Sequence, residues 1–520
     1  MASFPEMLAS GYGFTEPSIV LGAALHEGTV HTEPLVRLPL AMLARHGLIA
    51  GATGTGKTRT LQLLAEQLSA AGVPVFVSDI KGDLSGLAAE GASNDRIAAR
   101  ARETGRPWAP TSAPVEFVSL TGQRGVQLRA TVSSFGPLLL AKVLRLNETQ
   151  TSVLALVFKY ADDRGLPLLD FSDLRAVLQF LTSDEGRGEL KEYGGMSAAT
   201  VGVLLRKMVE LEQQGAERFF GEPEFDVQDL LTTTSDGRGV ITCLELADVQ
   251  DKPALFSTFM MWLLAELYHT LPEAGDLPKP KLVFFFDEAH LLFDDAPKAF
   301  IEQIEQVVRL VRSKGVGIYF VTQTPKDVPD DVLGQLGHRV QHALRAHTPD
   351  DEKALRATVR TFPKTNFYDL GETLTSLGIG EAVITVLGPR GVPTPVVATR
   401  LVAPGSRMAP LTETEFAADI AASDLIGEYG RVIDRESARE ILAKRMAAAA
   451  PPDAPAAPTP AEADKPRGRA GRTATQVVGG AVLGALGSTI GRTVGREVIR
   501  GLFGLLGAKP PRTTRRRTRW

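Results

Sequence analysis

Residues 47–58 read Gly47-Leu48-Ile49-Ala50-Gly51-Ala52-Thr53-Gly54-Thr55-Gly56-Lys57-Thr58, and this stretch decides the fold. Its first four residues form a short apolar run that ends in a glycine-rich turn, and residues 58–70 continue with helical spacing. Residues 75–79 are β-branched and aromatic and predict a second strand. A strand, a helix and a strand of these lengths form a βαβ unit. We therefore predict an α/β fold with a mostly parallel sheet that is covered by helices on both faces.

The glycine-rich turn matches the full pattern of a phosphate-binding loop, or P-loop. Glycines let the backbone curl so that successive N–H groups surround phosphate oxygens beside a helix N-terminus. Lys57 would reach the β- and γ-phosphates, and the hydroxyl of Thr58 would bind Mg²⁺. The sequence thus predicts a site for ATP and Mg²⁺. Its predicted binding residues are Gly51, Ala52, Thr53, Gly54, Thr55, Gly56, Lys57, Thr58 and Arg59.

An acidic pair follows another apolar strand. Residues 281–290 read KLVFFFDEAH, so the strand would deliver Asp287 to the carboxyl edge of the sheet, where open α/β folds bind ligands. Asp287 is predicted to hold Mg²⁺, directly or through water. Glu288 is predicted to polarise the attacking water as general base. Together with the P-loop, this pair predicts hydrolysis of a nucleoside triphosphate.

A third strand, residues 316–322, is followed by Gln323. This glutamine is predicted to contact the γ-phosphate or the attacking water, although a glutamine at a strand end can be a plain turn residue. Hydrolysis also benefits from an arginine placed against the developing charge, often by a neighbouring subunit. Each arginine considered can instead be an exposed helix charge. The candidates are Arg309, Arg312, Arg339 and Arg345, of which Arg339 and Arg345 are favoured.

Composition and periodicity divide the chain into segments. Leucines and valines recur at helical spacing between residues 137 and 232, which predicts an all-helical insertion in the α/β core. A Pro/Ala-rich stretch near the C-terminus cannot bury a core and is predicted to be a linker. The predicted segments are a short N-terminal β segment (1–45), the first part of the nucleotide-binding core (46–136), the helical insertion (137–232), the second part of the core (233–410), C-terminal helices (411–446), the linker (447–472), and a glycine-rich amphipathic helix with a basic tail (473–520).

Charge is unevenly distributed along the chain. The net charge is −4, yet residues 465–520 hold 13 basic residues and a single acidic one and carry +12, so the preceding 464 residues carry −16. A basic tail on an acidic body predicts an anionic partner, either nucleic acid or a membrane surface. Arg492, Arg496 and Arg500 would share one face of a basic amphipathic helix. Self-association through the glycines of this segment and a plain solubility tail are the alternatives.

The location of the protein is predicted from its cysteine content and its termini. Cys243 is the only cysteine, which excludes an intramolecular disulfide and fits a reducing cytosol. The N-terminal residues lack the pattern of a signal peptide, and the apolar runs are shorter than the roughly 18 residues of a membrane span. We expect a cytoplasmic protein, with peripheral attachment to a membrane through the basic tail as an open alternative.

The combined motifs resemble those of HerA-like and FtsK-type ATPases. The resemblance covers about residues 35–402, and it is nearest to the bacterial HerA-like branch with a Pro-rich linker and a Gly-rich C-terminal segment. The VTQTP strand end and the RSKG lead-in are the more specific motifs. The matching stretches are GATGTGKT (51–58), VFVSDIKGDLSGL (75–87), FFFDEAH (284–290), RSKGVGIYFVTQTP (312–325) and HRVQHALRAHTP (338–349).

This resemblance implies a RecA-like core assembled as a hexameric ring, with ATP at the subunit interfaces. Better-known members translocate on double-stranded DNA. The short N-terminal β segment departs from archaeal HerA proteins, which carry a fuller barrel there, and this puts a nuclease-docking role in doubt. Three functions stay open: a ring motor that acts on DNA as a translocase or helicase-like enzyme, a membrane-associated conjugation or secretion motor, and a nucleotide-gated assembly platform with slow hydrolysis.

Overall fold

The computed structural model describes residues 3–293 and 298–449, and it divides them between two compact units. Unit 1 comprises the described residues up to Ala130, Leu211–Phe219 and Pro223–Val432. Unit 2 comprises Thr131–Glu210, Phe220–Glu222 and the described residues from Ile433 onward. Among the helices of the described residues, none combines the length and hydropathy that crossing a membrane requires.

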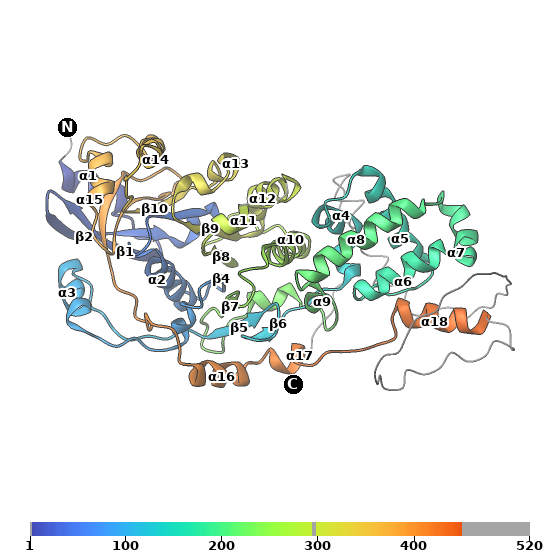
Figure 1. The fold of residues 1–520 in the computed structure, drawn as a ribbon. Helices are drawn as coiled ribbons and strands as arrows, with labels where there is room; N and C mark the ends of the chain where they lie inside the picture. Colours follow the sequence, from blue (N-terminus) through green and yellow to red (C-terminus); the bar gives the residue numbers. More distant parts are fainter. Residues whose placement is uncertain (1–2, 294–297, 450–520) are drawn as a thin grey trace, which may run out of the picture. The chain divides into compact units, whose positions relative to one another are not determined.

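Unit 1 is built on a single 12-stranded sheet (Figure 1) with the order β2-β1-β12-β11-β10-β3-β9-β8-β4-β7-β5-β6. From β10 to β6 all neighbouring strands are parallel, whereas the neighbours from β2 to β10 are antiparallel. The predicted mostly parallel sheet is confirmed. The strands are β1 (Ser18–His26), β2 (Thr29–Pro39), β3 (Gly47–Ala50), β4 (Val75–Asp79), β5 (Val115–Ser119), β6 (Val126–Gln127), β7 (Ile241–Glu245), β8 (Leu282–Phe286), β9 (Val316–Thr322), β10 (His338–His342), β11 (Glu381–Thr385) and β12 (Val397–Leu401).

The predicted N-terminal β segment becomes the edge of this sheet. Within residues 1–45, β1 and β2 are strands of nine and eleven residues that pair with each other. Strand β1 also pairs with β12, about 380 residues further along the chain, at Gly22 opposite Leu401. The N-terminal segment therefore extends the core sheet through an antiparallel pairing.

Helices cover the sheet of unit 1. They are α1 (Phe4–Tyr12), α2 (Lys57–Ala70), α3 (Asp95–Thr104), α9 (Ala216–Phe219), α10 (Pro253–Thr270), α11 (His290–Phe293), α12 (Lys298–Val311), α13 (Asp330–Leu333), α14 (Pro349–Arg360), α15 (Leu370–Ser376), α16 (Glu413–Ala422) and α17 (Ile426–Tyr429). Short 3₁₀ helices lie at η1 (Leu40–Arg45), η2 (Ser85–Ala88), η4 (Val227–Leu231), η5 (Arg312–Lys314) and η6 (Pro325–Asp327).

Both faces of the central strands are buried, which explains their nearly continuous apolar sequences. On one face, Leu61 and Leu64 of α2 belong to a hydrophobic cluster with Val77 of β4. On the other face, aromatic rings form a column in which Phe284 lies 4.9 Å from Phe76 and 5.9 Å from Phe286, centroid to centroid. This packing holds β4, β8 and β9 in place and thereby fixes the loops at their carboxyl ends.

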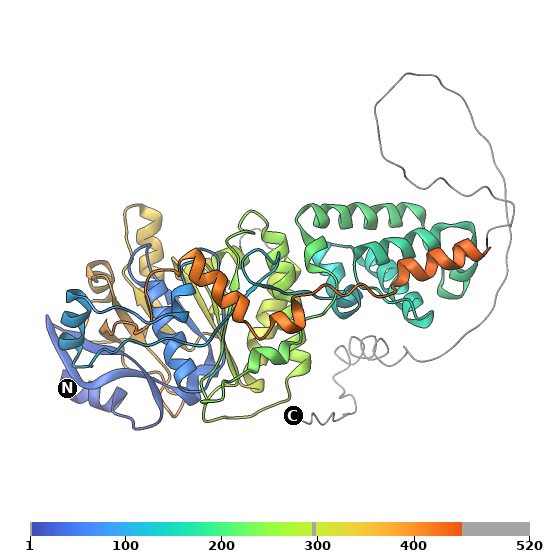
Figure 2. The same cartoon turned by 90° about the horizontal axis from the view of Figure 1, so that it is seen from below.

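In its described part, unit 2 is entirely helical, and its helices pack side by side (Figure 1 and Figure 2). Its helices are α4 (Val132–Val143), α5 (Glu148–Asp163), α6 (Phe171–Thr182), α7 (Asp184–Glu189), η3 (Leu190–Tyr193), α8 (Ala198–Gln213, whose end counts with unit 1) and α18 (Ala438–Ala449). The predicted helical insertion, residues 137–232, stays a prediction; its residues up to Glu210 lie in unit 2.

The helices of the predicted segment 411–446 are divided between the two units. Helix α16 belongs to unit 1, whereas α18 joins unit 2, where the N–H of Ala438 donates to Pro167 O at 2.9 Å. The predicted linker at 447–472 and the glycine-rich segment at 473–520 lie outside the described residues, except that α18 continues through Ala449.

Candidate functional site

The predicted site residues meet at the carboxyl edge of three adjacent strands. Strand β9 lies between β3, which leads into the P-loop, and β8, which leads into the acidic pair. The N–H of Gly51 donates to the carbonyls of Thr322 and Gln323 at 3.2 and 3.1 Å, and the N–H of Ala289 donates to Val321 O at 2.8 Å. The end of β9 is therefore hydrogen-bonded to both motifs, and Gln323 lies between them with an exposed side chain.

The P-loop has the curled backbone that its glycines predict. Gly54 and Gly56 have φ angles of +78° and +116°, which favour glycine, and a Cβ added at Gly51 would lie 2.4 Å from the Cβ of His342. The loop is anchored at both ends: the N–H of Ala52 donates to Ala343 O at 2.8 Å, and the N–H of Gly380 donates to Thr55 O at 3.0 Å. This is a loop whose N–H groups can surround an anion.

The side chains of Lys57, Thr58 and Arg59 differ in their surroundings. The Nζ of Lys57 donates to the loop's own carbonyls, Gly51 O at 2.7 Å and Ala52 O at 3.3 Å. Burial lowers the pKa of Lys57 from its usual value. Thr58 is half-buried in the first turn of α2. Arg59 donates to Gln62 Oε1 at 2.9 Å along the same helix, so its guanidinium has a partner outside the loop.

The acidic pair lies where β8 ends, and both side chains are buried. Burial raises the pKa of Asp287 to about 7, and the neighbouring charges of Glu288 and Asp79 act in the same direction. Among the described residues, Asp287 Oδ2 has no hydrogen-bond partner although it is buried. A buried carboxylate oxygen without a partner is costly unless a cation or a donor completes it. A hard divalent cation that prefers oxygen ligands, such as Mg²⁺, therefore fits Asp287.

Glu288 has an unusual backbone conformation. Its φ of +47° lies in the left-handed region, which a residue with a side chain adopts at a cost of roughly 1 kcal/mol. Such conformations persist where the surrounding structure imposes them, and they cluster at functional sites. The Oε2 of Glu288 lies 3.3 Å from Nδ1 of His290, and the two atoms form no hydrogen bond.

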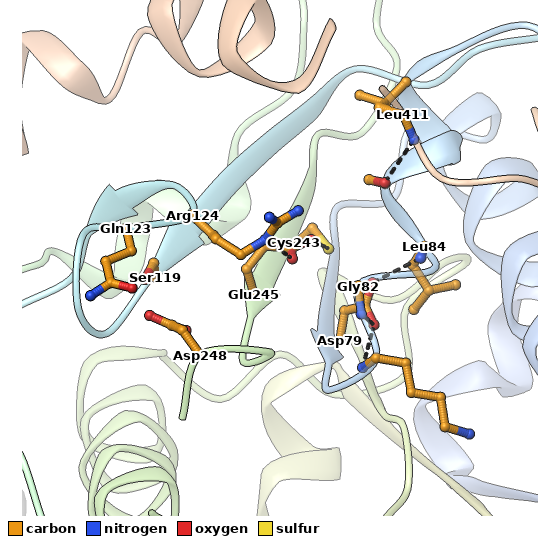
Figure 3. Close-up of polar contacts among 12 residues, drawn as sticks. Asp79, Gly82, Leu84, Ser119, Gln123, Arg124, Cys243, Glu245, Asp248 and Leu411 are labelled. Carbon is orange, nitrogen blue, oxygen red and sulfur yellow. Dashed lines mark hydrogen bonds and ion pairs between the residues drawn. The ribbon is translucent and has the colours of Figure 1, made fainter. Parts of the chain in front are cut away.

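Lys81, which contacts Glu288, had no predicted role. Lys81 Nζ donates a hydrogen bond to Glu288 Oε1, and the two groups form an ion pair. Lys81 belongs to the loop after β4, which folds around the carboxylate of Asp79. Figure 3 shows Gly82 and Leu84 donating to this carboxylate, at 2.7 and 2.8 Å. The stretch VFVSDIKGDLSGL contributed to the family resemblance, but it gave these residues no role.

A second acidic pair, Asp79 and Glu245, was also missed. The two residues are register partners on β4 and β7, and both are fully buried. Arg124 Nε lies 3.5 Å from Glu245 Oε2, and Cys243 Sγ lies 3.8 Å from Glu245 Oε1 (Figure 3). Burial, together with the charge of Asp79, raises the pKa of Glu245 to about 8, while Arg124 opposes this shift. Glu245 therefore holds its proton at neutral pH.

This raised pKa predicts a pH-dependent stability. The folded state binds the proton of Glu245 more tightly than the unfolded state, whose carboxyl has its ordinary pKa of 4.5. The contribution of Glu245 to the free energy of unfolding is thus greatest below about pH 4.5, and it is lost as the pH rises through about 8. We expect wild type to lose about 2 kcal/mol more of its free energy of unfolding than Glu245→Gln between pH 6.5 and 9.

Urea unfolding at several pH values measures this difference. Glu413→Gln is the matched control, because Glu413 is an exposed carboxylate that contacts the same arginine, Arg124. If Glu245→Gln and Glu413→Gln follow the wild-type pH dependence equally, Glu245 does not titrate as described.

The four candidate arginines differ in how near their backbone positions lie to the P-loop. Arg345 is exposed and comes two residues after Ala343, whose carbonyl binds the P-loop. Arg339 lies earlier on β10, opposite Leu48, and its guanidinium donates to Thr361 Oγ1 at 2.6 Å. Arg309 and Arg312 precede β9 and so lie toward the opposite edge of the sheet. Within one chain the fold brings only Arg345, of these four, close to the P-loop.

The chain is similar in sequence to known proteins. The family model described as "Helicase HerA-like C-terminal" matches residues 25–511. The DNA double-strand break repair helicase HerA of Saccharolobus solfataricus is 23% identical over 353 residues, which cover 67% of this chain and 63% of that protein. The chain thus spans less than two thirds of the length of this relative.

Two solved structures share the fold. The bacterial conjugative coupling protein TrwBdeltaN70 matches with a TM-score of 0.51 and 16% identity over 79% of this chain and 94% of that chain. The plasmid coupling protein TrwB in complex with the non-hydrolysable ATP analogue ADPNP matches with a TM-score of 0.50 and 15% identity over 79% of this chain and 96% of that chain. The predicted RecA-like P-loop architecture is confirmed.

Proposed function

This chain belongs to the helicase HerA-like C-terminal family, and from that membership we propose that it is an ATP-hydrolysing motor of the HerA/FtsK type that acts on DNA. The observation that carries the proposal is the meeting of the P-loop, Gln323 and the buried pair Asp287–Glu288 at the ends of β3, β9 and β8. The relative from Saccharolobus solfataricus is named a DNA double-strand break repair helicase, which supports DNA as the substrate.

The P-loop binds ATP in this proposal. The related TrwB structure holds an ATP analogue, which supports this ligand. Lys57 exchanges the carbonyls of Gly51 and Ala52 for phosphate oxygens, and the backbone N–H groups of the loop donate to the same phosphates. Thr58 and Asp287 would hold Mg²⁺, which would supply positive charge to neutralise the phosphates.

Glu288 takes a proton from the attacking water. The water oxygen bonds to the γ-phosphorus, the bond from this phosphorus to the β-phosphate oxygen breaks, and ADP leaves with that electron pair. Gln323 orients the water or the γ-phosphate, because the end of β9 is hydrogen-bonded to both motifs. Arg345 stabilises the developing charge, either within its own subunit or across an interface.

We further propose a homo-oligomeric ring, hexameric by family resemblance, with ATP between subunits. The basic tail, residues 465–520, supplies a site for an anionic partner, either DNA or a membrane surface, on a protein that works in the cytoplasm. The exposed position of Arg345 supports the ring, because an arginine at the surface can reach a neighbouring subunit.

Duplex DNA is expected to stimulate phosphate release by this protein. Phosphate contacts release counterions, so the DNA concentration for half-maximal stimulation should rise steeply with salt, by roughly 10³-fold or more between 50 and 200 mM if about six or more phosphates are contacted. Titrating duplex DNA against phosphate release at several salt concentrations measures this. Lys57→Ala is the background control. ATP hydrolysis that duplex DNA leaves unchanged at low salt would exclude a DNA-driven motor.

A further inference from the structure

A lysine outside the P-loop contacts the general base. Lys81 Nζ is hydrogen-bonded to Glu288 Oε1. The side chain of Glu288 is 7% exposed, whereas that of Lys81 is 48% exposed. Packing therefore holds the carboxylate in place but leaves much of the lysine stem in solvent. Of these two partners, Lys81 is the one that can move.

The loop that carries Lys81 is anchored at its base. Oδ1 of Asp79 accepts the N–H groups of Lys81 and Gly82 at 3.1 and 2.7 Å, and Oδ2 accepts the N–H of Leu84. The carbonyl of Ile80 accepts from the side chain of Gln250 at 2.5 Å. Figure 3 shows Gly82 and Leu84 beside the buried carboxylate of Asp79. The Cα of Lys81 is thus fixed beside the site, while its ammonium can exchange partners over the length of one side chain.

The charges around Glu288 show what the ammonium of Lys81 can reach. Burial lowers the pKa of Lys57, and the nearby charge of Lys81 lowers it further. Burial raises the pKa of Asp287, and Lys81 opposes that shift. Lys81 therefore lies within electrostatic reach of both the P-loop lysine and the metal-binding carboxylate. Lys57 is hydrogen-bonded to its own loop, so Lys81 is the lysine in direct contact with Glu288.

Within the ion pair, Oε1 of Glu288 already accepts a hydrogen bond from Lys81 Nζ, so this oxygen is occupied when a water approaches. A γ-phosphate bound beside Lys57 would offer more negative charge and more acceptor oxygens than one carboxylate. The ammonium of Lys81 would then have a stronger partner within reach.

We propose that Lys81 is a γ-phosphate sensor that exchanges Glu288 for the γ-phosphate when ATP binds. The exchange leaves Glu288 Oε1 available to accept the proton of the attacking water. ADP lacks the γ-phosphate and leaves the Lys81–Glu288 pair intact, so the exchange separates the ATP state from the ADP state. The inference rests on the proposed ATP site and adds a positioning residue that regulates its base.

The test is a thermodynamic cycle measured by binding. A non-hydrolysable ATP analogue and ADP, each with Mg²⁺, are titrated into wild type, Lys81→Met, Glu288→Gln and the double variant. Lys81→Met is expected to weaken the affinity for the analogue about 10-fold or more, which is the effect of losing one hydrogen bond to a charged group. Its affinity for ADP should stay within about 2-fold of that of wild type. Glu288→Gln removes the charge that competes for Lys81, so it should raise the affinity for the analogue several-fold. This gain should vanish in the double variant, which lacks Lys81.

Two further variants act as controls. Lys81→Arg keeps the positive charge and should restore part of the preference for the analogue over ADP. Lys353→Met removes an exposed lysine of α14 and should change neither affinity. Additive effects of Lys81→Met and Glu288→Gln, or equal losses for analogue and ADP in Lys81→Met, would overturn the sensor.

Failure of the proposed function gives a different result. If wild type does not bind the analogue, or if Lys57→Ala binds it as tightly as wild type, the ATP site itself is wrong and the sensor falls with it. If wild type binds the analogue in a Lys57-dependent way but the cycle shows no coupling, only the role of Lys81 is wrong.

Discussion

Glu288→Gln is expected to bind ATP and to release phosphate about 10²–10⁴ times more slowly than wild type. The amide keeps the shape of the buried carboxylate, but it cannot accept a proton from water. Bound nucleotide and phosphate release, measured on the same preparation, separate the two properties. The expected pattern is full occupancy with almost no turnover.

Two variants bracket this result. Lys57→Ala should lose productive nucleotide binding, because no other residue of the P-loop offers an ammonium to the β- and γ-phosphates. Glu302→Gln removes an exposed carboxylate of α12 and should behave as wild type. Normal turnover by Glu288→Gln would show that another group takes the proton.

Arg345→Ala is expected to slow ATP hydrolysis by about 10³-fold or more, the effect of removing an arginine that stabilises the transferred phosphoryl group. If the guanidinium acts across a subunit interface, Arg345→Ala and Glu288→Gln are each inactive alone. A mixture of the two should recover part of the activity, because some interfaces then combine an intact Arg345 with an intact Glu288. Phosphate release as a function of the mixing ratio measures this recovery.

Arg339→Ala is the matched comparison for Arg345→Ala. Because Arg339 lies earlier on β10, opposite Leu48 and further from the P-loop, its removal should have a smaller effect on turnover. A protein that is monomeric by light scattering and hydrolyses ATP at its full rate would exclude an arginine supplied in trans. Two inactive variants that stay inactive in every mixture would place Arg345 in the same site as Glu288.

The P-loop and the acidic pair could be predicted because their signals are local. In each case a buried strand ends in a few polar residues of fixed type, and no distant contact is needed to recognise them. The same holds for the parallel sheet, since strand, helix and strand follow one another along residues 47–79. These features could therefore be predicted from neighbouring residues and elementary chemistry alone.

Contacts between distant segments could not be predicted in the same way. Lys81 and Glu288 are 207 residues apart, and Asp79 meets Glu245 only because β4 and β7 are neighbours in the sheet. The position of β9 between β3 and β8 is likewise a property of strand order, which side-chain periodicity does not encode. The residues that surround the acidic pair therefore emerged only with the fold.

Helix α18 has a practical consequence for the design of shortened proteins. Its Ala438 and Leu442 are buried, and its first N–H groups donate to Pro167 O and to a carboxylate oxygen of Asp173. Cutting the chain before Ala438 would remove α18, which packs against α6. The apolar surface exposed in this way promotes aggregation and proteolysis. A tail-deletion variant for liposome or DNA pull-down should therefore retain every residue through Ala449, so that weaker capture reports on the tail and not on a damaged helical unit.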